Sequence, residues 1–469
     1  MVQGWSAGFE VPYDPDWVVP RRDWRHSLPL LPRRPLSAVL LAVLAAGIAG
    51  LLALWWQETP ADRMQSLPDY LVMLAQITGL VGAYLLLVEI ALMARLPWLE
   101  HRLGSWLASA HRSLGGYLVL LLCAHVGFVI AAYSVSVHDS PPAVLVSILR
   151  TYPGVLAATI GFLVMLLAGF TSARSIRRRL GYEGWHAIHL LMYPAAAAAF
   201  WHQITLGAQF TRNPWAADVW VGLHAVVGAA IVCNRIVIPL LNNRHHRFRV
   251  SRVEAVGPDA MNVYITGRRV ADLGAEAGQY FRWRFMQRSL WYQAHPFSLS
   301  AAPHADTLRL TFKCVGGYTR RLKRRLRPGS RVFLDGPYGA FTGVLRRQPG
   351  VVMIGGGIGV TPLRAIVETM HNRRRNDIIF IQRASKVGDL ILTNELEALN
   401  AVGRIIYIPA IGSRRNDPLS ADRLLDLIPD LEFREVFICG SVGMAAAAVR
   451  NLRRAGVRRG RIHTEIFDF

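Results

Sequence analysis

Uncharged apolar segments long enough to cross a membrane occur repeatedly in the first half of the chain. A transmembrane helix needs about 20 consecutive apolar residues, and the chain after residue 241 has no run of that length. Six segments meet the requirement, with Glu89 and Arg235 near two of their ends: residues 36–57, 71–94, 113–137, 153–173, 185–210 and 219–241. We therefore predict six transmembrane helices within residues 35–242, after a basic segment at residues 1–34.

The second half of the chain has the shorter periods of β-strands, followed by alternating strands and helices. Apolar and polar residues alternate at 248–250, 261–266 and 280–285, with Phe281, Trp283 and Phe285 on one face, which predicts a small antiparallel barrel over residues 247–345. Apolar strands at 351–354, 378–382, 405–408 and 435–438 are separated by helical stretches. This pattern predicts an α/β domain with a parallel sheet over residues 346–469.

Composition supports a membrane protein, and charge gives its orientation. The 469 residues are 52% hydrophobic and carry 53 Lys and Arg against 31 Asp and Glu, a net charge of +22. Arginines gather before the first apolar segment and in the loops after the second and fourth, as expected of cytoplasmic loops. We therefore expect both termini and the second half to lie in the cytoplasm. The first apolar segment starts too late, and lacks the cleavage site, for a signal peptide.

Several other functions are excluded by residue types. The four cysteines, Cys123, Cys233, Cys314 and Cys439, are isolated, which argues against a zinc site, an iron–sulfur cluster or a disulfide framework. Only three of the cations are lysines, a bias that codon usage explains. The positive charge has uses in the membrane loops and around cofactor phosphates, so it does not indicate binding to nucleic acid.

Four histidines in the membrane segments have the spacing of two stacked sites. His111 and His125 are 14 residues apart, so on one helix they face nearly the same way, roughly 21 Å apart along the axis. His189 and His202 are 13 residues apart and out of phase on a straight helix, although Pro194 between them can distort it. Both segments run outward from the cytoplasm, so His111 matches His189 in depth and His125 matches His202.

Histidines matched at two depths predict two haem sites. Neutral imidazole is a standard axial ligand of haem iron, and two stacked haems give electrons a route through a bilayer. The alternative for any single histidine is a hydrogen-bonded packing residue. His101, His186 and His224 have no partner in depth and are assigned to that class. We predict that iron is bound by His111, His125, His189 and His202.

The predicted barrel contains two candidate contacts for a planar cofactor that carries phosphate. An aromatic ring and a hydroxyl alternate along the short strand His295, Pro296, Phe297 and Ser298, which is otherwise an ordinary edge strand. Gly316, Gly317 and Thr319 precede a basic helical stretch, where free backbone N–H groups and the helix dipole favour a phosphate. The alternative is a glycine turn before a solvated helix.

A strand, a glycine-rich loop and a helix follow one another in the α/β segment. This order is typical of a nucleotide-binding crossover, although the pattern is GxGxxP rather than GxGxxG. Thr361 is expected as the N-cap and Pro362 as the first helical residue. The next strand ends at Arg383 and Ser385 without an acid for a ribose hydroxyl, which favours NADPH over NADH. The loop glycines are Gly355, Gly356, Gly357 and Gly359.

Together these motifs resemble the NADPH oxidase and ferric reductase superfamily over about residues 36 to 469, and look closest to its bacterial members. His111 to Gly115 with His125 is similar to the family's third-helix pattern, and His189 to His202 has the family's spacing. The resemblance implies a multidomain membrane protein in the bacterial cytoplasmic (inner) membrane. It would have a six-helix transmembrane di-haem bundle, an antiparallel β-barrel FAD-binding domain and an α/β NADPH-binding domain.

The resemblance also implies residue roles. His295 to Ser298 would contact the FAD isoalloxazine, Gly316 to Thr319 its pyrophosphate, and Gly355 to Pro362 the NADPH pyrophosphate. Arg383 and Ser385 would meet the 2′-phosphate, and Cys439 and Gly440 the nicotinamide. Phe469 would stack on the flavin and give way to nicotinamide. The residues expected at the chemical step are Phe297, Ser298, Cys439 and Phe469.

The predicted function is transfer of electrons from NADPH across a membrane lipid bilayer. Electrons would pass from NADPH to FAD, then to an inner and an outer b-type haem, and finally to oxygen, giving superoxide, or to a ferric chelate. Two other functions stay open: a haem-bearing sensor or assembly subunit without turnover, and a membrane-anchored flavin reductase without haem. The sequence assigns no protein partner and gives no support for activation by calcium.

Overall fold

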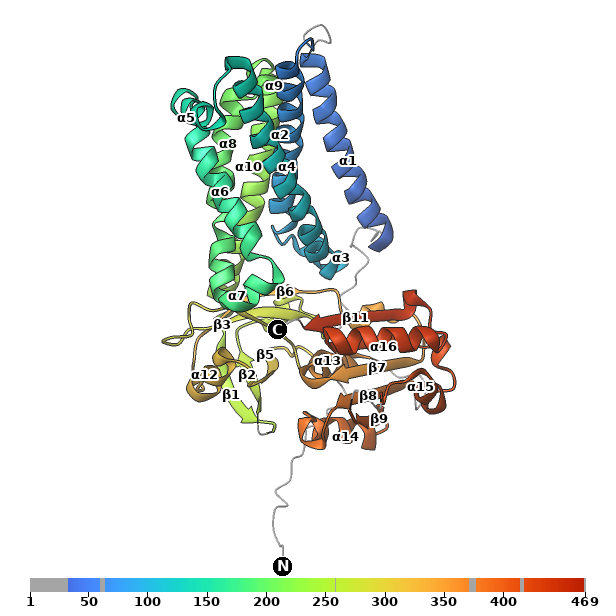
Figure 1. Ribbon diagram of the computed structural model, residues 1–469. Helices are drawn as coiled ribbons and strands as arrows, with labels where there is room; N and C mark the ends of the chain where they lie inside the picture. The colour runs from blue at the N-terminus through green and yellow to red at the C-terminus, as the bar shows by residue number, and fades with distance from the viewer. Residues whose placement is uncertain (1–32, 60–63, 258, 371–376, 414–416, 468–469) are drawn as a thin grey trace, which may run out of the picture.

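The computed structural model describes residues 33–59, 64–257, 259–370, 377–413 and 417–467. A bundle of helices stands above a half built from strands and shorter helices, and strand β11 (Ile462–Phe467) ends close to the junction between them (Figure 1). The predicted basic segment is almost entirely outside the described residues, and so is Phe469.

The helical half follows the apolar segments closely. Its elements are α1 (Arg33–Glu58), α2 (Leu67–Leu92), α3 (Pro97–Leu103), α4 (Ser105–Val137), α5 (Pro141–Thr151), α6 (Val155–Thr171), α7 (Arg174–Leu190), α8 (Met192–Leu206), α9 (Ala208–Thr211), α10 (Pro214–Val232) and α11 (Ile238–His246). The π-helical turn Cys233–Val237 joins α10 to α11 without a break. Large apolar side chains such as Leu120 and Phe170 face outward, each 67% exposed, as acyl chains require.

The number of membrane spans differs from the prediction. Within the described residues, four helices are long and apolar enough to cross a membrane, and five if the pair Val155–Thr171 and Arg174–Gly181, bent by 88°, is one span. Six spans are therefore not confirmed. The fifth predicted segment is divided at Leu191 between α7 and α8. The ring of Pro194 lies where it crowds the carbonyl of Leu190, four residues earlier, which explains an interruption at this place.

The half built from strands and shorter helices, called the strand-containing half below, begins with two antiparallel three-stranded sheets. One has the order β1-β2-β5 and the other β4-β3-β6. Their bounds are β1 (Arg249–Ala255), β2 (Ala260–Thr266), β3 (Tyr280–Phe285), β4 (His295–Ser298), β5 (Thr307–Lys313) and β6 (Val332–Tyr338), and helix α12 (Gly317–Arg325) follows β5. Phe281, Trp283 and Phe285 are fully buried in a core shared by both sheets, which agrees with their predicted common face.

A closed barrel is not confirmed for these strands. Isolated bridges, Arg249 with Arg331 and Leu299 with Leu310, connect the two sheets at their edges. Backbone hydrogen bonds accompany them, such as those from the Val250 N–H to the Ser330 carbonyl and from the Ser300 N–H to the Arg309 carbonyl. The two sheets are therefore joined at both edges by short contacts rather than by full ladders.

The second part is an α/β domain with a five-stranded parallel sheet, as predicted. The strand order is β11-β10-β7-β8-β9 and every neighbouring pair is parallel. Val351 and Met353 face one core while Val352 and Ile354 face the other, so helices cover both faces. The remaining elements are β7 (Val351–Gly356), α13 (Val360–Thr369), β8 (Ile378–Ala384), α14 (Thr393–Ala401), β9 (Ile406–Ile411), α15 (Ala421–Leu427), β10 (Glu435–Ser441) and α16 (Val442–Arg454).

A buried ion-pair network joins the two parts of the strand-containing half. Arg309 on β5 donates two parallel hydrogen bonds to the carboxylate of Glu395 on α14, at 3.0 and 2.9 Å. Arg364 on α13 contacts the same carboxylate at 2.6 Å. A bidentate pair of this kind fixes orientation as well as distance, so it sets how the parallel sheet lies against the antiparallel sheets.

Candidate functional site

One cavity of about 2050 Å³ is lined by residues from all three parts of the molecule. The helical half contributes Met93, Arg95, Glu100, Leu107 and Glu183. Residues of β3, β4 and α12 line the next part, and the carboxyl ends of β7, β8 and β10 line the rest. Ligands of open α/β sheets bind at this edge of the strands. The cavity therefore connects the expected nucleotide edge to the ends of the helices that face the two sheet domains.

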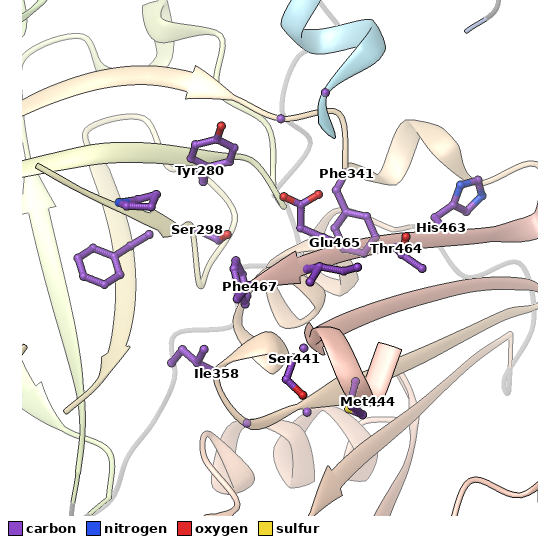
Figure 2. A pocket seen from close by; sticks show the side chains of 18 of the residues that line it. Tyr280, Ser298, Phe341, Ile358, Ser441, Met444, His463, Thr464, Glu465 and Phe467 are labelled. Atoms are coloured by element: carbon purple, nitrogen blue, oxygen red, sulfur yellow. The ribbon is translucent and has the colours of Figure 1, made fainter. Parts of the chain in front are cut away.

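The predicted flavin contacts lie on β4 beside the long strand β3. Ser298 pairs in register with Tyr280, and both side chains line the cavity (Figure 2). Burial lowers the pKa of His295 to about 4, with contributions from Arg282 and Arg321, although Glu183 opposes the shift. The His295 imidazole is therefore neutral at pH 7. Burial also raises the pKa of Tyr280 to about 12.

The start of α12 leaves polar groups open to the cavity. The Gly316 N–H donates to Thr319 Oγ1 at 3.1 Å, which caps the helix. The buried Tyr318 hydroxyl has no hydrogen-bond partner in the described residues, and its ring stacks on His295 with centroids 3.6 Å apart. A Cβ on Gly316 would meet no atom within 4 Å. An unpartnered hydroxyl and open backbone at a helix start fit a ligand with phosphate oxygens, such as FAD.

Two positions in the glycine loop between β7 and α13 require glycine. Gly357 has a φ of 55°, in the left-handed region that favours glycine. A Cβ on Gly359 would come within 2.2 Å of the Cys439 carbonyl oxygen, so only glycine lets this loop lie against β10. Gly356 and Gly357 line the cavity. Backbone is thus brought to the ligand edge, as a pyrophosphate site requires.

The predicted helix start in this loop is wrong by a small amount. Helix α13 begins at Val360, directly after the 3₁₀ turn Gly357–Gly359, so Thr361 lies inside the first turn. Its hydroxyl donates to the Ile358 carbonyl at 2.8 Å rather than capping the helix. The 3₁₀ turn winds straight into the helix and therefore moves its start before Thr361.

The structure brings most of the predicted cofactor residues to the same cavity. Arg383 at the end of β8 lines it, and its Nη2 donates to the Gly412 carbonyl at 2.7 Å. The predicted residues in the lining are His295, Pro296, Phe297, Ser298, Gly316, Gly317, Thr319, Gly356, Gly357, Arg383, Ser385 and Gly440. Those outside the lining are Gly355, Gly359, Thr361, Pro362 and Cys439.

Cys439 is fully buried in the hydrophobic core beside the sheet. Burial raises the pKa of its thiol well above the ordinary value, so the thiol stays protonated. Its backbone, which approaches Gly359, is the part closest to the glycine loop. A catalytic role for the side chain stays a prediction.

Two residues near the C-terminus that were not predicted also line the cavity. Phe467 lies between Ser298 on one side and Ser441 on the other, and Glu465 lies near Phe341 and Tyr280 (Figure 2). The predicted aromatic residue, Phe469, lies outside the described residues. The alternation of side chains along β11 places Phe467 and Glu465 on one face, but their position depends on strand order that the sequence pattern does not give.

The strand-containing half is attached to the helical half by polar contacts. The Asn243 side chain on α11 both donates to the Leu334 carbonyl, at 2.6 Å, and accepts from the Leu334 N–H, at 2.7 Å. Arg95, after α2, lies 3.7 Å from Asp335 and 4.4 Å above the Tyr338 ring centre. Because Leu334 belongs to the edge strand β6, the two hydrogen bonds of Asn243 satisfy backbone groups of that edge.

The two histidines of the predicted inner pair lie close together in the structure. The ring centres of His111 and His189 are 5.9 Å apart. The outer pair, His125 with His202, stays a prediction. An imidazole nitrogen binds a metal at about 2 Å, so two imidazoles on opposite sides of one iron have ring centres roughly 6 Å apart. The inner pair therefore fits bis-histidine ligation of a haem.

Neighbouring side chains hold the histidine rings in place. The Nδ1 atom of His125 lies 2.8 Å from the Ala75 carbonyl, and the Nδ1 atom of His111 contacts the Glu89 carboxylate. Trp185 stacks on His189 with ring centres 5.2 Å apart. The buried Nδ1 of His189 has no hydrogen-bond partner in the described residues. Glu89 could have been recognised from the sequence, since an acid inside an apolar segment is a functional candidate.

Three family models match successive parts of the chain. Residues 78–200 match a ferric reductase-like transmembrane component, residues 245–342 an FAD-binding domain, and residues 353–450 an oxidoreductase NAD-binding domain. Successive segments of this chain are therefore similar to a ferric reductase-type transmembrane domain, an FAD-binding module and an NAD-binding module. The chain is homologous to NADPH oxidases and to flavohemoprotein.

Individual relatives are similar over parts of the chain. The flavohemoprotein of Vibrio cholerae serotype O1 is 27% identical over 207 residues, which are 42% of this chain and 52% of that protein. Dual oxidase 2 of Rattus norvegicus is 38% identical over 84 residues, 16% of this chain and 6% of that protein. The NADPH oxidoreductase of Mycobacterium tuberculosis is 25% identical over 240 residues, covering 49% and 62%. This chain thus spans less than two thirds of each of these relatives.

Among solved structures, the FAD/NAD-binding domain of nitric oxide dioxygenase from Vibrio cholerae O1 biovar El Tor is 23% identical. The similarity covers 48% of this chain and 99% of that chain, with a TM-score of 0.41.

Proposed function

We propose that the protein takes electrons from cytoplasmic NADPH and delivers them to an acceptor on the opposite face of a bacterial inner membrane. The observation that carries the proposal is the single cavity that extends from the nucleotide edge to the cytoplasmic ends of the helices. At those ends the inner histidine pair begins a route through the bilayer. The proposed domains are residues 35–242, 247–345 and 346–469.

FAD and two b-type haems would supply the chemistry in this proposal, which is acceptance of a hydride from NADPH and transfer of single electrons. The chain's own residues would bind and orient these groups. His111 with His189 and His125 with His202 would hold the iron, and the start of α12 would hold the FAD pyrophosphate. One NADPH then reduces two acceptor molecules by one electron each, and its proton stays on the cytoplasmic side.

The nucleotide side is proposed to prefer NADPH. Arg383 and Ser385 follow β8 at the cavity edge, where a 2′-phosphate meets a guanidinium and a hydroxyl. The acceptor on the far side is oxygen, giving superoxide, or a ferric chelate. Comparing superoxide production with ferric-chelate reduction in oriented vesicles separates these two acceptors.

Haem spectroscopy of the purified full chain tests the proposal. Anaerobic NADPH is expected to reduce two haems per chain. His111→Ala and His125→Ala should each remove one haem, since each removes one axial ligand. His224→Ala is the matched control, because His224 lies on α10 with its Nδ1 bonded to the Trp220 carbonyl at 2.9 Å, and it should keep both haems. A wild-type protein that binds haem but is not reduced by NADPH contradicts the proposal and favours a sensor or assembly subunit.

A further inference from the structure

Helix α2 contacts both histidines of α4 through the same ring atom. The His125 Nδ1 lies 2.8 Å from the Ala75 carbonyl, and the His111 Nδ1 contacts the Glu89 carboxylate. Ala75 and Glu89 are 14 residues apart, as are His111 and His125, and the order is reversed because the two helices are antiparallel. In each histidine the Nδ1 atom is thereby occupied, so Nε2 is the atom left for a metal.

The two contacts differ in chemistry. The outer histidine meets a neutral backbone carbonyl, whereas the inner histidine meets a carboxylate. Glu89 is 4% exposed, and neither of its oxygens has a hydrogen-bond partner of its own elsewhere in the described residues. Carboxylates at membrane depth are rare and need a partner. Glu89 therefore does not serve a second structural contact that would explain its presence on α2.

We propose that Glu89 is the positioning residue of His111, and that the contrast between its carboxylate and the Ala75 carbonyl makes the inner site the stronger electron donor. This inference rests on the proposed function. A carboxylate that accepts the second N–H of a ligating histidine fixes the ring and raises its basicity as a ligand. A more basic ligand favours ferric over ferrous iron, which lowers the midpoint potential.

The proposed difference in midpoint potential between the inner and outer sites favours electron transfer in one direction. If the inner site has the lower potential, electrons move outward along a falling energy gradient, from His111 and His189 toward His125 and His202. The contacts made by Ala75 and Glu89 on α2 thus favour electron transfer through the helical half in the outward direction. Gly79, one turn from Ala75, adds to the outer contact, since a Cβ there would lie 2.7 Å from the His125 Nδ1.

Redox titration of the haem spectrum in the full-length protein tests the inference. In a His125→Ala background only the inner pair remains, so its midpoint potential can be measured alone. Glu89→Gln keeps the side-chain shape and removes the carboxylate. We expect the inner potential to become more positive and the outer potential, measured in a His111→Ala background, to stay unchanged. Glu89→Leu should weaken haem binding at the inner site roughly 10- to 100-fold.

Two controls keep the result specific. Glu58→Gln removes a carboxylate that bonds Asn213 at 2.7 Å on another helix, and it should leave both potentials unchanged. Gly79→Ala should disturb the outer site and not the inner one. An inner potential that is the same in Glu89→Gln and wild type overturns the inference, and so does an equal shift at both sites.

If Glu89→Gln does not retain the inner haem, Glu89→Asp decides the question. Recovery of inner haem by the shorter carboxylate supports the positioning role. Failure to recover it in a protein with normal helix content contradicts that role. Failure of the underlying function is distinct, because it would be seen in the wild type, as absence of haem or absence of reduction by NADPH.

Discussion

The helical half and the strand-containing half place their polar groups in opposite ways. In the helical half, Leu120 and Phe170 are each 67% exposed while the carboxylate-bearing Glu89 is 4% exposed. In the strand-containing half, Val352 and Ile354 are fully buried, as water requires. One half of the chain is thus suited to contact with lipid and the other half to contact with water.

This difference changes what a buried acid indicates. In the strand-containing half, Glu395 pairs with Arg309 and Arg364 and joins two structural units. In the helical half, Glu89 contacts a histidine of the proposed haem site and no arginine among the described contacts. Buried acids are structural in one half and point to the cofactor in the other.

If the two halves unfold independently, the largest loss of stability is expected from breaking the ion pairs of Glu395 with Arg309 and Arg364. Arg309→Ala leaves Glu395 with Arg364 alone, so we expect a loss of about 3 kcal/mol, the lower end of the range for a broken buried pair. Denaturation followed by flavin fluorescence should show this loss, while the haem absorption of the same sample unfolds as in wild type. Simultaneous loss of both signals would show that the halves unfold as one unit.

The same network predicts a dependence on pH. Burial alone would raise the pKa of Glu395, but Arg364 and Arg309 outweigh it and hold the pKa below the ordinary value. The pair therefore stabilises the folded state above the unfolded pKa of about 4.3, and this stability is lost as pH falls through the lower folded pKa. Glu395→Gln should remove that acid-dependent part of the flavin-domain stability.

The next largest effect is expected at the glycine loop. In Gly359→Ala the new Cβ would meet the Cys439 carbonyl at 2.2 Å, and overpacking of this kind costs about 1–3 kcal/mol. We expect the KM for NADPH to rise roughly 10- to 100-fold, with haem content unchanged. Gly460→Ala is the matched control, because a Cβ there meets no atom within 4 Å. An unchanged KM would contradict the close approach of the loop to β10.

The smallest effect is expected at the junction of the halves. Arg95→Ala removes a contact with Asp335 and a cation–π contact with Tyr338, together worth about 1 kcal/mol. Flavin reduction by NADPH should be unchanged, and haem reduction should slow several-fold in stopped-flow absorbance. Arg252→Ala is the control, since Arg252 lies over Tyr264 in a similar way, 4.1 Å from its ring centre, but away from the junction. Equal slowing in both variants would contradict a role for the junction.

The sequence predicted features that depend on local period and missed those that depend on packing between elements. The apolar segments located α1, α2, α4 and α10, and the strand pattern predicted the parallel sheet. The break at Leu191 and the position of Thr361 depend on how one turn continues into the next.

The site was predictable where residues share one element. The spacing of His111 and His125 on one helix shows in the sequence, whereas the contact between His111 and Glu89 requires α2 to lie against α4. Phe467 likewise reaches the cavity only because β11 is the edge strand beside β10. Contacts of this kind join positions that have no fixed separation in the chain.

The contact positions are 14 residues apart on both α2 and α4, so the spacing on one helix has to match the spacing on the other. One residue inserted between His111 and His125 would turn the second imidazole by about 100° and move it about 1.5 Å along the axis. Ala75 would then face a different side chain, while Glu89 and His111 would still meet. Insertions and deletions in this part of the bundle are therefore tolerated only when both helices change by the same number of residues.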